Sequence, residues 1–215
     1  HPKGGGFVAN TAFAAPTATV GPQAFVCARA QVLQEANIQG TAVVDDEARV
    51  SGRSMIYGGA VVQAKAEVTD DAVVGGTAFV QGHARVSGNA LVAGPKVVIE
   101  GTAQISGAAF VVEYAHVDGD AQVSDLRSQI AIYHNTTVAG HAHVTASAQV
   151  SDGSFVGDWA TVGGSATITD ESIVGANATV DGAARLRNKS TAAGNAHITG
   201  SARLSGDTVD KGIKN

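Results

Sequence analysis

The sequence has few of the residues that normally build a globular core or a covalent framework. Its 215 residues include one cysteine, one tryptophan, one methionine and four prolines, and aromatic residues make up 5%. A single cysteine, Cys27, excludes an intrachain disulfide and a zinc site built from clustered cysteines. No apolar run approaches the roughly 20 residues of a transmembrane helix, and no basic-then-apolar segment indicates a signal peptide. We therefore expect no membrane span.

Charged residues are also scarce, at 15% of the chain, and the net charge is −5. This acidic balance argues against a nucleic-acid partner, because such a partner is normally bound through a basic surface. Glycine, in contrast, is abundant: the 27 glycines far exceed the usual share of about 7%. A chain with so few large side chains must build its interior from many small ones.

What the sequence does contain is a repeat of six residues, x-Ala-x-Val-x-Gly, seen in TAFVQG, HARVSG and NALVAG. The chain from Gly5 to Gly206 divides into 33 such units, with Ala at 25 second positions and Val or Ile at 29 fourth positions. Two interruptions break the pattern, namely Pro95 and the triplet Leu126, Arg127 and Ser128. The regularity over this length indicates one elongated unit.

Each unit is predicted to be a short β-strand followed by a corner. The second and fourth positions point to the same side of an extended chain, whereas they would not stay on one face of a helix. Gly, Asp and Asn fill most sixth positions, where they tolerate a turn with positive φ. A strand with such small inward residues cannot bury a core alone, so we expect the units to stack as coils.

This pattern resembles the hexapeptide-repeat family, whose chains form a left-handed parallel β-helix with three hexapeptides in each triangular coil. The resemblance covers residues 5–206 and implies an all-β solenoid of about 11 coils, about 50 Å long. Residues 1–4 would be an N-terminal lead-in and residues 207–215 a C-terminal tail. The left hand is taken from the resemblance, because it departs from the usual right-handed crossover rule.

Every third unit shares one outer face, so the sequence also predicts what each face carries. All six phenylalanines fall at outward third positions, four of them on the first face, while the second face is polar and the third is apolar only from Met55 to Ala131. A soluble monomer rarely exposes so long an apolar stripe. We therefore predict an interface on the first face, formed by Phe7, Phe25, Val43, Val61, Phe79, Val98, Phe155 and Ile173.

The corner between the third and first faces carries the candidate chemistry. Glu113 and His134 are expected to stack on adjacent coils within hydrogen-bonding distance, and with Tyr114 they could perform general acid–base catalysis. The same corner could instead bind a sugar, for which the candidates are Lys96, Tyr114, His116, Tyr133 and His134. A solvated corner without a function is the third possibility.

Enzymes of the hexapeptide-repeat family are mostly acyltransferases with a histidine base, and some are zinc carbonic anhydrases. This sequence departs from both patterns, because SGDTVDKGIKN predicts no helix after the solenoid and no long loop protrudes from it. The family's zinc enzymes have two ligands of one chain five residues apart, and His116, His134, His141 and His143 lack that spacing. We therefore expect neither a metal nor a cofactor.

The favoured interpretation is a non-catalytic structural module that forms a homo-oligomer or a filament through its apolar face. The alternatives are an acyltransferase-like enzyme and a glycan-binding module with a polysaccharide partner. The opening HPKGGGFVAN followed by the repeat resembles solenoid tails of secreted bacterial proteins, which implies an extracellular or cell-surface location. An enzyme of the family would instead be cytoplasmic.

Overall fold

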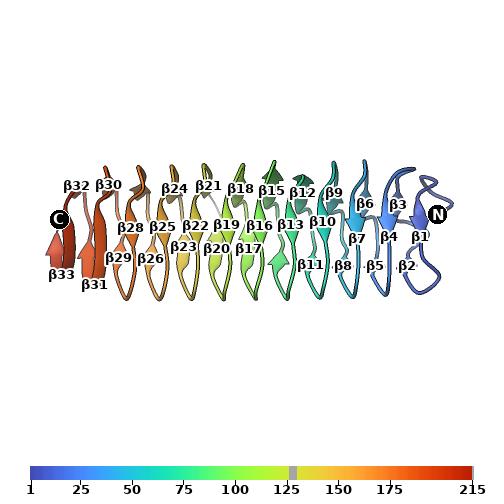
Figure 1. Cartoon of the computed structure of the whole chain (residues 1–215), viewed down its shortest axis with the longest axis horizontal. Helices are drawn as coiled ribbons and strands as arrows, with labels where there is room; N and C mark the ends of the chain where they lie inside the picture. Colours follow the sequence, from blue (N-terminus) through green and yellow to red (C-terminus); the bar gives the residue numbers. More distant parts are fainter. Residues whose placement is uncertain (126–129, 215) are drawn as a thin grey trace.

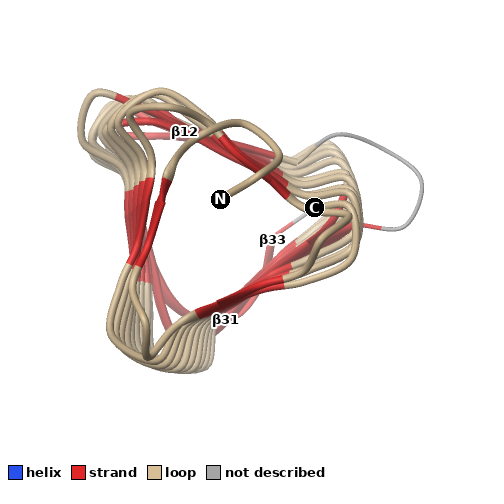
Figure 2. Ribbon diagram, turned by 90° about the vertical axis from the view of Figure 1, so that its right-hand side faces the viewer, coloured by secondary structure: helices blue, strands red, loops and turns tan. Residues whose placement is uncertain are grey.

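The chain forms a rod of stacked coils. The computed structural model describes residues 1–125 and 130–214, and every regular element within them is a β-strand. The coils follow one another along the rod with the two termini at opposite ends (Figure 1), and the view along the rod shows three flat sides (Figure 2). The all-β parallel solenoid of about 11 coils is thus confirmed. The expected interruption at Leu126, Arg127 and Ser128 lies outside the described residues.

Most strands are two residues long, because each coil must turn three corners. The first face consists of β1 (Phe7–Val8), β4 (Phe25–Val26), β7 (Val43–Val44), β10 (Val61–Val62), β13 (Phe79–Val80), β16 (Val98–Ile99), β19 (His116–Val117), β22 (Thr137–Val138), β25 (Phe155–Val156), β28 (Ile173–Val174) and the start of β31 (Thr191–Ile198). The second face consists of β2 (Phe13–Ala14), β5 (Gln31–Val32), β8 (Arg49–Val50), β11 (Glu67–Val68), β14 (Arg85–Val86), β17 (Gln104–Gly107), β20 (Gln122–Asp125), β23 (His143–Thr145), β26 (Thr161–Val162), β29 (Thr179–Val180) and the end of β31. The third face consists of β3 (Thr19–Val20), β6 (Asn37–Ile38), β9 (Met55–Ile56), β12 (Val73–Gly76), β15 (Leu91–Gly94), β18 (Phe110–Val112), β21 (Ala131–Ile132), β24 (Gln149–Val150), β27 (Thr167–Ile168), β30 (Arg185–Arg187) and β32 (Arg203–Ser205). The last strand, β33 (Thr208–Lys214), pairs with β31.

Each strand pairs in parallel with the strand one coil further on, so residues in register form columns along the rod. Phe25 is the register partner of Phe7 on one side and of Val43 on the other. The column continues unbroken past the inserted Pro95, because Phe79 is in register with Val98. A corner insertion therefore changes the sequence spacing between neighbours and leaves their spatial alignment unchanged.

The interior is built from the small residues that the repeat places inward. Ala84 and Val86 are typical, since both are fully buried and their equivalents in the neighbouring coils are buried too. The larger Val97 and Ile130 occupy second positions and are also fully buried. Among the described residues, Ile and Leu are the largest that fill the core, and all six phenylalanines are partly or largely exposed. The predicted inward second and fourth positions and outward third positions are confirmed, whereas some fifth positions, such as Ser151, are buried.

The hydrogen bonds at the corners explain why aspartate, like glycine, can occupy the sixth position. Asp46, Asp70 and Asp158 all have positive φ, between 57° and 62°. The carboxylate of Asp46 accepts a hydrogen bond from the backbone N–H of Ala64, one coil further on, at 3.0 Å. Such bonds satisfy corner N–H groups, so the capping offsets the strain of positive φ in a residue with a Cβ.

A few second positions hold a hydroxyl in place of alanine, and these side chains differ in their hydrogen bonding. Ser54 and Ser190 are fully buried, and each donates to the carbonyl three residues earlier, at 2.8 Å and 2.6 Å. Ser172 is also fully buried, but its Oγ has no hydrogen-bond partner in the described part of the chain. This unpaired hydroxyl should destabilise the fold.

Replacing Ser172 with Ala, the usual residue at this position, is expected to raise the free energy of unfolding by about 1 kcal/mol, because a buried unpaired hydroxyl costs about 1–3 kcal/mol. Thermal and denaturant unfolding followed by circular dichroism measure the change. Ser54→Ala is the matched control, and it should be neutral or destabilising because it removes an existing hydrogen bond. A Ser172→Ala variant no more stable than the wild type would contradict the prediction.

Candidate functional site

The first face carries the predicted aromatic column. Register partners link Phe7, Phe25, Val43, Val61, Phe79 and Val98 into one continuous row. The rings are accessible: Phe25 is 45% exposed and Phe79 40% exposed. Phe7 and Phe25 contact each other, with ring centroids 5.9 Å apart. Phe155 and Ile173 continue the same column nearer the C-terminal end, beyond His116 and Thr137.

A second column runs beside the aromatic one, and the sequence interpretation missed it. Its residues are the outward fifth positions of the first face, where Gln63 Nε2 donates to Gln81 Oε1 at 2.9 Å and Gln81 Nε2 donates to Glu100 Oε2 at 2.7 Å. We call Gln63, Gln81 and Glu100 the polar ladder. The signal that could have revealed it is the recurrence of amide and carboxyl side chains at intervals of 18 or 19 residues. On the first face the third-position column is therefore mainly apolar, whereas the fifth-position column is polar from Asp45 to Asp118.

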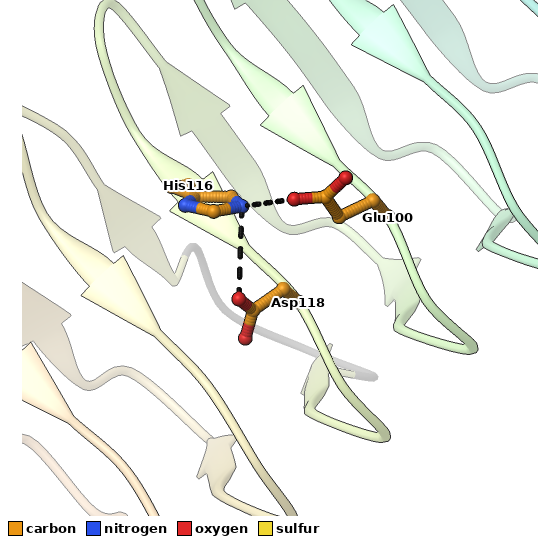
Figure 3. Close-up of side chains that lie close together, drawn as sticks. All are labelled: Glu100, His116 and Asp118. Atoms are coloured by element: carbon orange, nitrogen blue, oxygen red, sulfur yellow. Dashed lines mark hydrogen bonds and ion pairs between the residues drawn. The ribbon is translucent and has the colours of Figure 1, made fainter.

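The polar ladder ends in a cluster of three titratable side chains (Figure 3). Nε2 of His116, on β19, lies 2.8 Å from Glu100 Oε1 and 3.8 Å from Asp118 Oδ2. About a third of each side chain is exposed. His116, a candidate for sugar binding beside the corner, has these two carboxylates of the first face as its polar partners.

The hydrogen bonds at Glu100 also affect its acidity. The amide of Gln81, and next the ring of His116, donate to the carboxylate and hold the pKa of Glu100 below its usual value. Burial acts in the opposite direction and is the weaker effect. Glu100 is therefore a carboxylate at neutral pH, and its oxygens are held in place from two sides.

The corner between the third and first faces confirms the expected proximity of Glu113 and His134. Glu113 Oε2 lies 3.0 Å from Nε2 of His134, and Asp152 Oδ1 lies 2.7 Å from Nδ1 of the same ring. We call these three residues the His134 corner. Tyr133 packs edge-on against the His134 ring, with centroids 4.7 Å apart. Both ring nitrogens of His134 are thus engaged by carboxylates.

A run of glycines at this corner ends at Glu113. The equivalent positions in the four preceding coils are Gly40, Gly58, Gly76 and Gly94, and a Cβ on Gly76 would lie only 2.4 Å from the carbonyl oxygen of Gly94. From Glu113 onward the corner accommodates side chains, although Glu113 and His134 still have positive φ, 65° and 54°. The side chains of the His134 corner therefore project from backbone in the left-handed region, as the corner aspartates do.

The other residues expected at this corner do not join the group. Lys96 is exposed, and its backbone N–H donates to the carbonyl of Glu113 at 3.2 Å. Tyr114 is 50% exposed, and no hydrogen bond or ring contact joins it to His134 in the described part of the chain. The expected group of His, Glu and Tyr114 is therefore replaced by His134 with two carboxylates and Tyr133. This arrangement suits a structural bridge better than a general base, which needs a free nitrogen lone pair.

The third face has a wider apolar surface than the sequence interpretation described. Both outward columns are apolar in its middle, with Met55, Val73, Leu91, Phe110 and Ala131 at third positions and Tyr57, Ala93, Val112 and Tyr133 at fifth positions. The ring of Tyr57 covers Gly75, where a Cβ would be 2.1 Å from the ring. This surface is a second apolar area. An experiment on association through the first face must therefore also include a variant of the third face.

The comparisons with known proteins add no family assignment: no protein-family profile matches the sequence, and a search of curated proteins finds no match. The described residues contain no helix of the length and hydrophobicity needed to cross a bilayer. The geometry of the faces and corners therefore indicates what the chain can bind.

Replacing Gln81 with Leu should raise the pKa of the Glu100 carboxyl towards its usual value, because the strongest of the hydrogen bonds that stabilise the carboxylate is lost. In the wild type this lowered pKa contributes stability that is present above the unfolded-state pKa and is lost as the pH falls through the folded-state pKa. An NMR pH titration of the Glu100 side-chain carbonyl carbon measures the pKa. An unchanged midpoint in Gln81→Leu would show that the ladder does not set the acidity of Glu100.

Proposed function

We propose that the chain is a non-catalytic structural module that associates with a second copy of itself through the first face. The observation that carries this proposal is the position of the phenylalanines. The core is complete without them, yet Phe7, Phe25, Phe79 and Phe155 are in one register column on the outside of the rod. Exposed aromatic rings of this number need a partner surface to exclude water.

The size of the face supports a contact between two rods. The unbroken row from Phe7 to Val98 spans six coils, about 24 Å at the spacing of neighbouring strands. The whole face, about 50 Å long and about 20 Å wide, offers on the order of 1,000 Å², estimated from strand geometry. That area is comparable to the ~800 Å² per partner of a stable protein–protein interface.

A second copy is the partner that fits this surface best. Another rod of the same chain has outward side chains at the same spacing along its length, so ridges and gaps can match over many coils. A twofold arrangement would bring the same patch of both rods together, as in most homodimers. The polar ladder beside the aromatic column would then supply amide groups at the interface, where a polar margin commonly surrounds an apolar centre.

The six-residue repeat favours placing the chain among hexapeptide-repeat proteins, and the resemblance to solenoid tails favours an extracellular or cell-surface location. The transferase alternative has less support, because both nitrogens of His134 are occupied by Glu113 and Asp152. A structural module that associates through its first face does not require Glu113, His134 or Asp152 to react. Polysaccharide binding at the same corner has the exposed Tyr114 in its favour, but Tyr133 packs against His134.

Phe25→Glu should weaken self-association at least tenfold, because it places a charge in the middle of the apolar column, which costs more than about 1.4 kcal/mol. Light scattering after size-exclusion chromatography, over a range of protein concentrations, measures the change. Gln31→Glu is the matched control, since it adds the same charge at the same outward position of the same coil on the second face. Circular dichroism should show both variants fully folded.

Two outcomes of this experiment would contradict the proposal. One is a wild-type chain that stays monomeric at concentrations up to about 1 mM, where even a weak interface of about −4 kcal/mol is half occupied. The other is loss of association in Leu91→Glu but not in Phe25→Glu. That result would assign the interface to the third face.

Cys27 gives an independent readout, because it lies at an outward fifth position of the first face, two residues after Phe25. Partial burial and the nearby Asp45 raise the pKa of its thiol, so alkylation at pH 8 should be slower than for free cysteine even in the monomer. Association through the first face should slow the reaction further as the protein concentration rises. Phe79→Glu, three coils away, should react at a rate independent of concentration. Equal rates for the wild type at low and high concentration would argue against burial of this face.

A further inference from the structure

The Glu100–His116–Asp118 cluster differs from the other histidine sites in the direction of its carboxylates. Both carboxylates face the same ring nitrogen, Nε2, and the three potential ligand atoms lie within 4.8 Å of one another. Figure 3 shows the carboxylates of Glu100 and Asp118 both directed at the same ring nitrogen of His116. The cluster thus offers one imidazole nitrogen and two carboxylate oxygens to a single position.

Two other histidines show what this convergence requires. At the His134 corner the carboxylates contact opposite nitrogens of the ring, so they cannot share one ion with the same nitrogen. His141 has one carboxylate partner, Asp120 at 3.1 Å from Nδ1, and its ring stacks on Trp159 with centroids 4.0 Å apart. In the described residues, the one grouping of three potential ligands within 4.8 Å is the cluster at His116.

The surroundings of the cluster supply the support that metal ligands need. Gln81 donates to the Glu100 oxygen that does not face His116, and Gln63 in turn donates to Gln81. This outer shell fixes the orientation of the carboxylate, and such partners commonly affect metal affinity by about 10–100-fold. The sheet fixes the remaining geometry, because Glu100 and Asp118 follow the neighbouring strands β16 and β19. About a third of each ligand is exposed, so an ion and its water can enter.

We propose that Glu100, His116 and Asp118 form a binding site for a divalent transition-metal ion of the zinc type. One nitrogen and two oxygens suit such an ion, whereas Mg²⁺ and Ca²⁺ prefer oxygen ligands alone. Ligands about 2.0–2.2 Å from a tetrahedral ion are about 3.4 Å apart. The observed separations of 2.8 Å and 3.8 Å bracket that value, so small side-chain rotations admit the ion. Water completes the coordination.

The ion would replace the hydrogen bond between His116 and Glu100, and the Nε2 lone pair would point to it. This site does not depend on self-association, because all three protein ligands come from one chain. It does lie on the first face, two register steps beyond Phe79. The metal experiment and the association experiment therefore have separate readouts.

The test is a titration of the full chain with Zn²⁺, followed by isothermal calorimetry and by the NMR signals of the histidine rings. The His116 signals should shift first, and His116→Ala, Glu100→Gln and Asp118→Asn should each lower the affinity of that site at least tenfold. His134→Ala is the matched control, since it removes a histidine that also contacts two carboxylates, and it should bind as the wild type does. The two amide variants keep the shape of the side chains, so their folding is not in question.

The proposal is overturned if His116 signals do not move at about 1 mM Zn²⁺, the concentration at which a site of about −4 kcal/mol is half filled. It is also overturned if His116→Ala and wild type bind with equal affinity, which would assign zinc binding to another histidine. Equal loss in His116→Ala and His134→Ala would show that zinc binds histidines without regard to the convergence of carboxylates.

Discussion

The narrow interior of the coil is the constraint on which the rest of the molecule depends. Three short strands meet around an axis, and the space between them accepts Ala at one inward position and Val or Ile at the other. Residues larger than Ile or Leu do not fit in this interior and point outward. This is why the phenylalanines are on the surface and why Ile and Leu are the largest buried side chains in the part of the chain that the structure describes. The same constraint makes the surface regular, because every outward side chain has a register partner one coil away.

This regularity explains why the fold could be read from the sequence. Inward and outward positions follow from a period of two in a strand, and the corners follow from glycine and aspartate every sixth residue. The proximity of Glu113 and His134 was predicted correctly from two local properties. These are the six-residue unit in which each residue lies and its position within that unit. The handedness had no such local signal and was taken from a family resemblance.

The site was less predictable, because it depends on how side chains orient and not on where their backbones lie. The contact of Asp152 with the second nitrogen of His134 decides what that ring can do, and it depends on the rotamers of both side chains. Glu100 and Asp118 were missed because the faces were interpreted from their third positions alone. Their convergence on His116 requires rotamers and hydrogen-bond directions, which a repeat pattern does not contain.

The direction of the hydrogen bonds has a mechanical consequence. The hydrogen bonds between coils run along the rod, whereas the peptide chain runs across it. A force that pulls on the two ends therefore acts directly on these hydrogen bonds, which are weaker than the covalent bonds of the chain. Failure would start at an end and release one coil of 18 residues at a time, each lengthening the chain by about 60 Å while shortening the rod by about 5 Å. Under tension, a rod of this kind should therefore lengthen in steps, with one coil released from an end at each step.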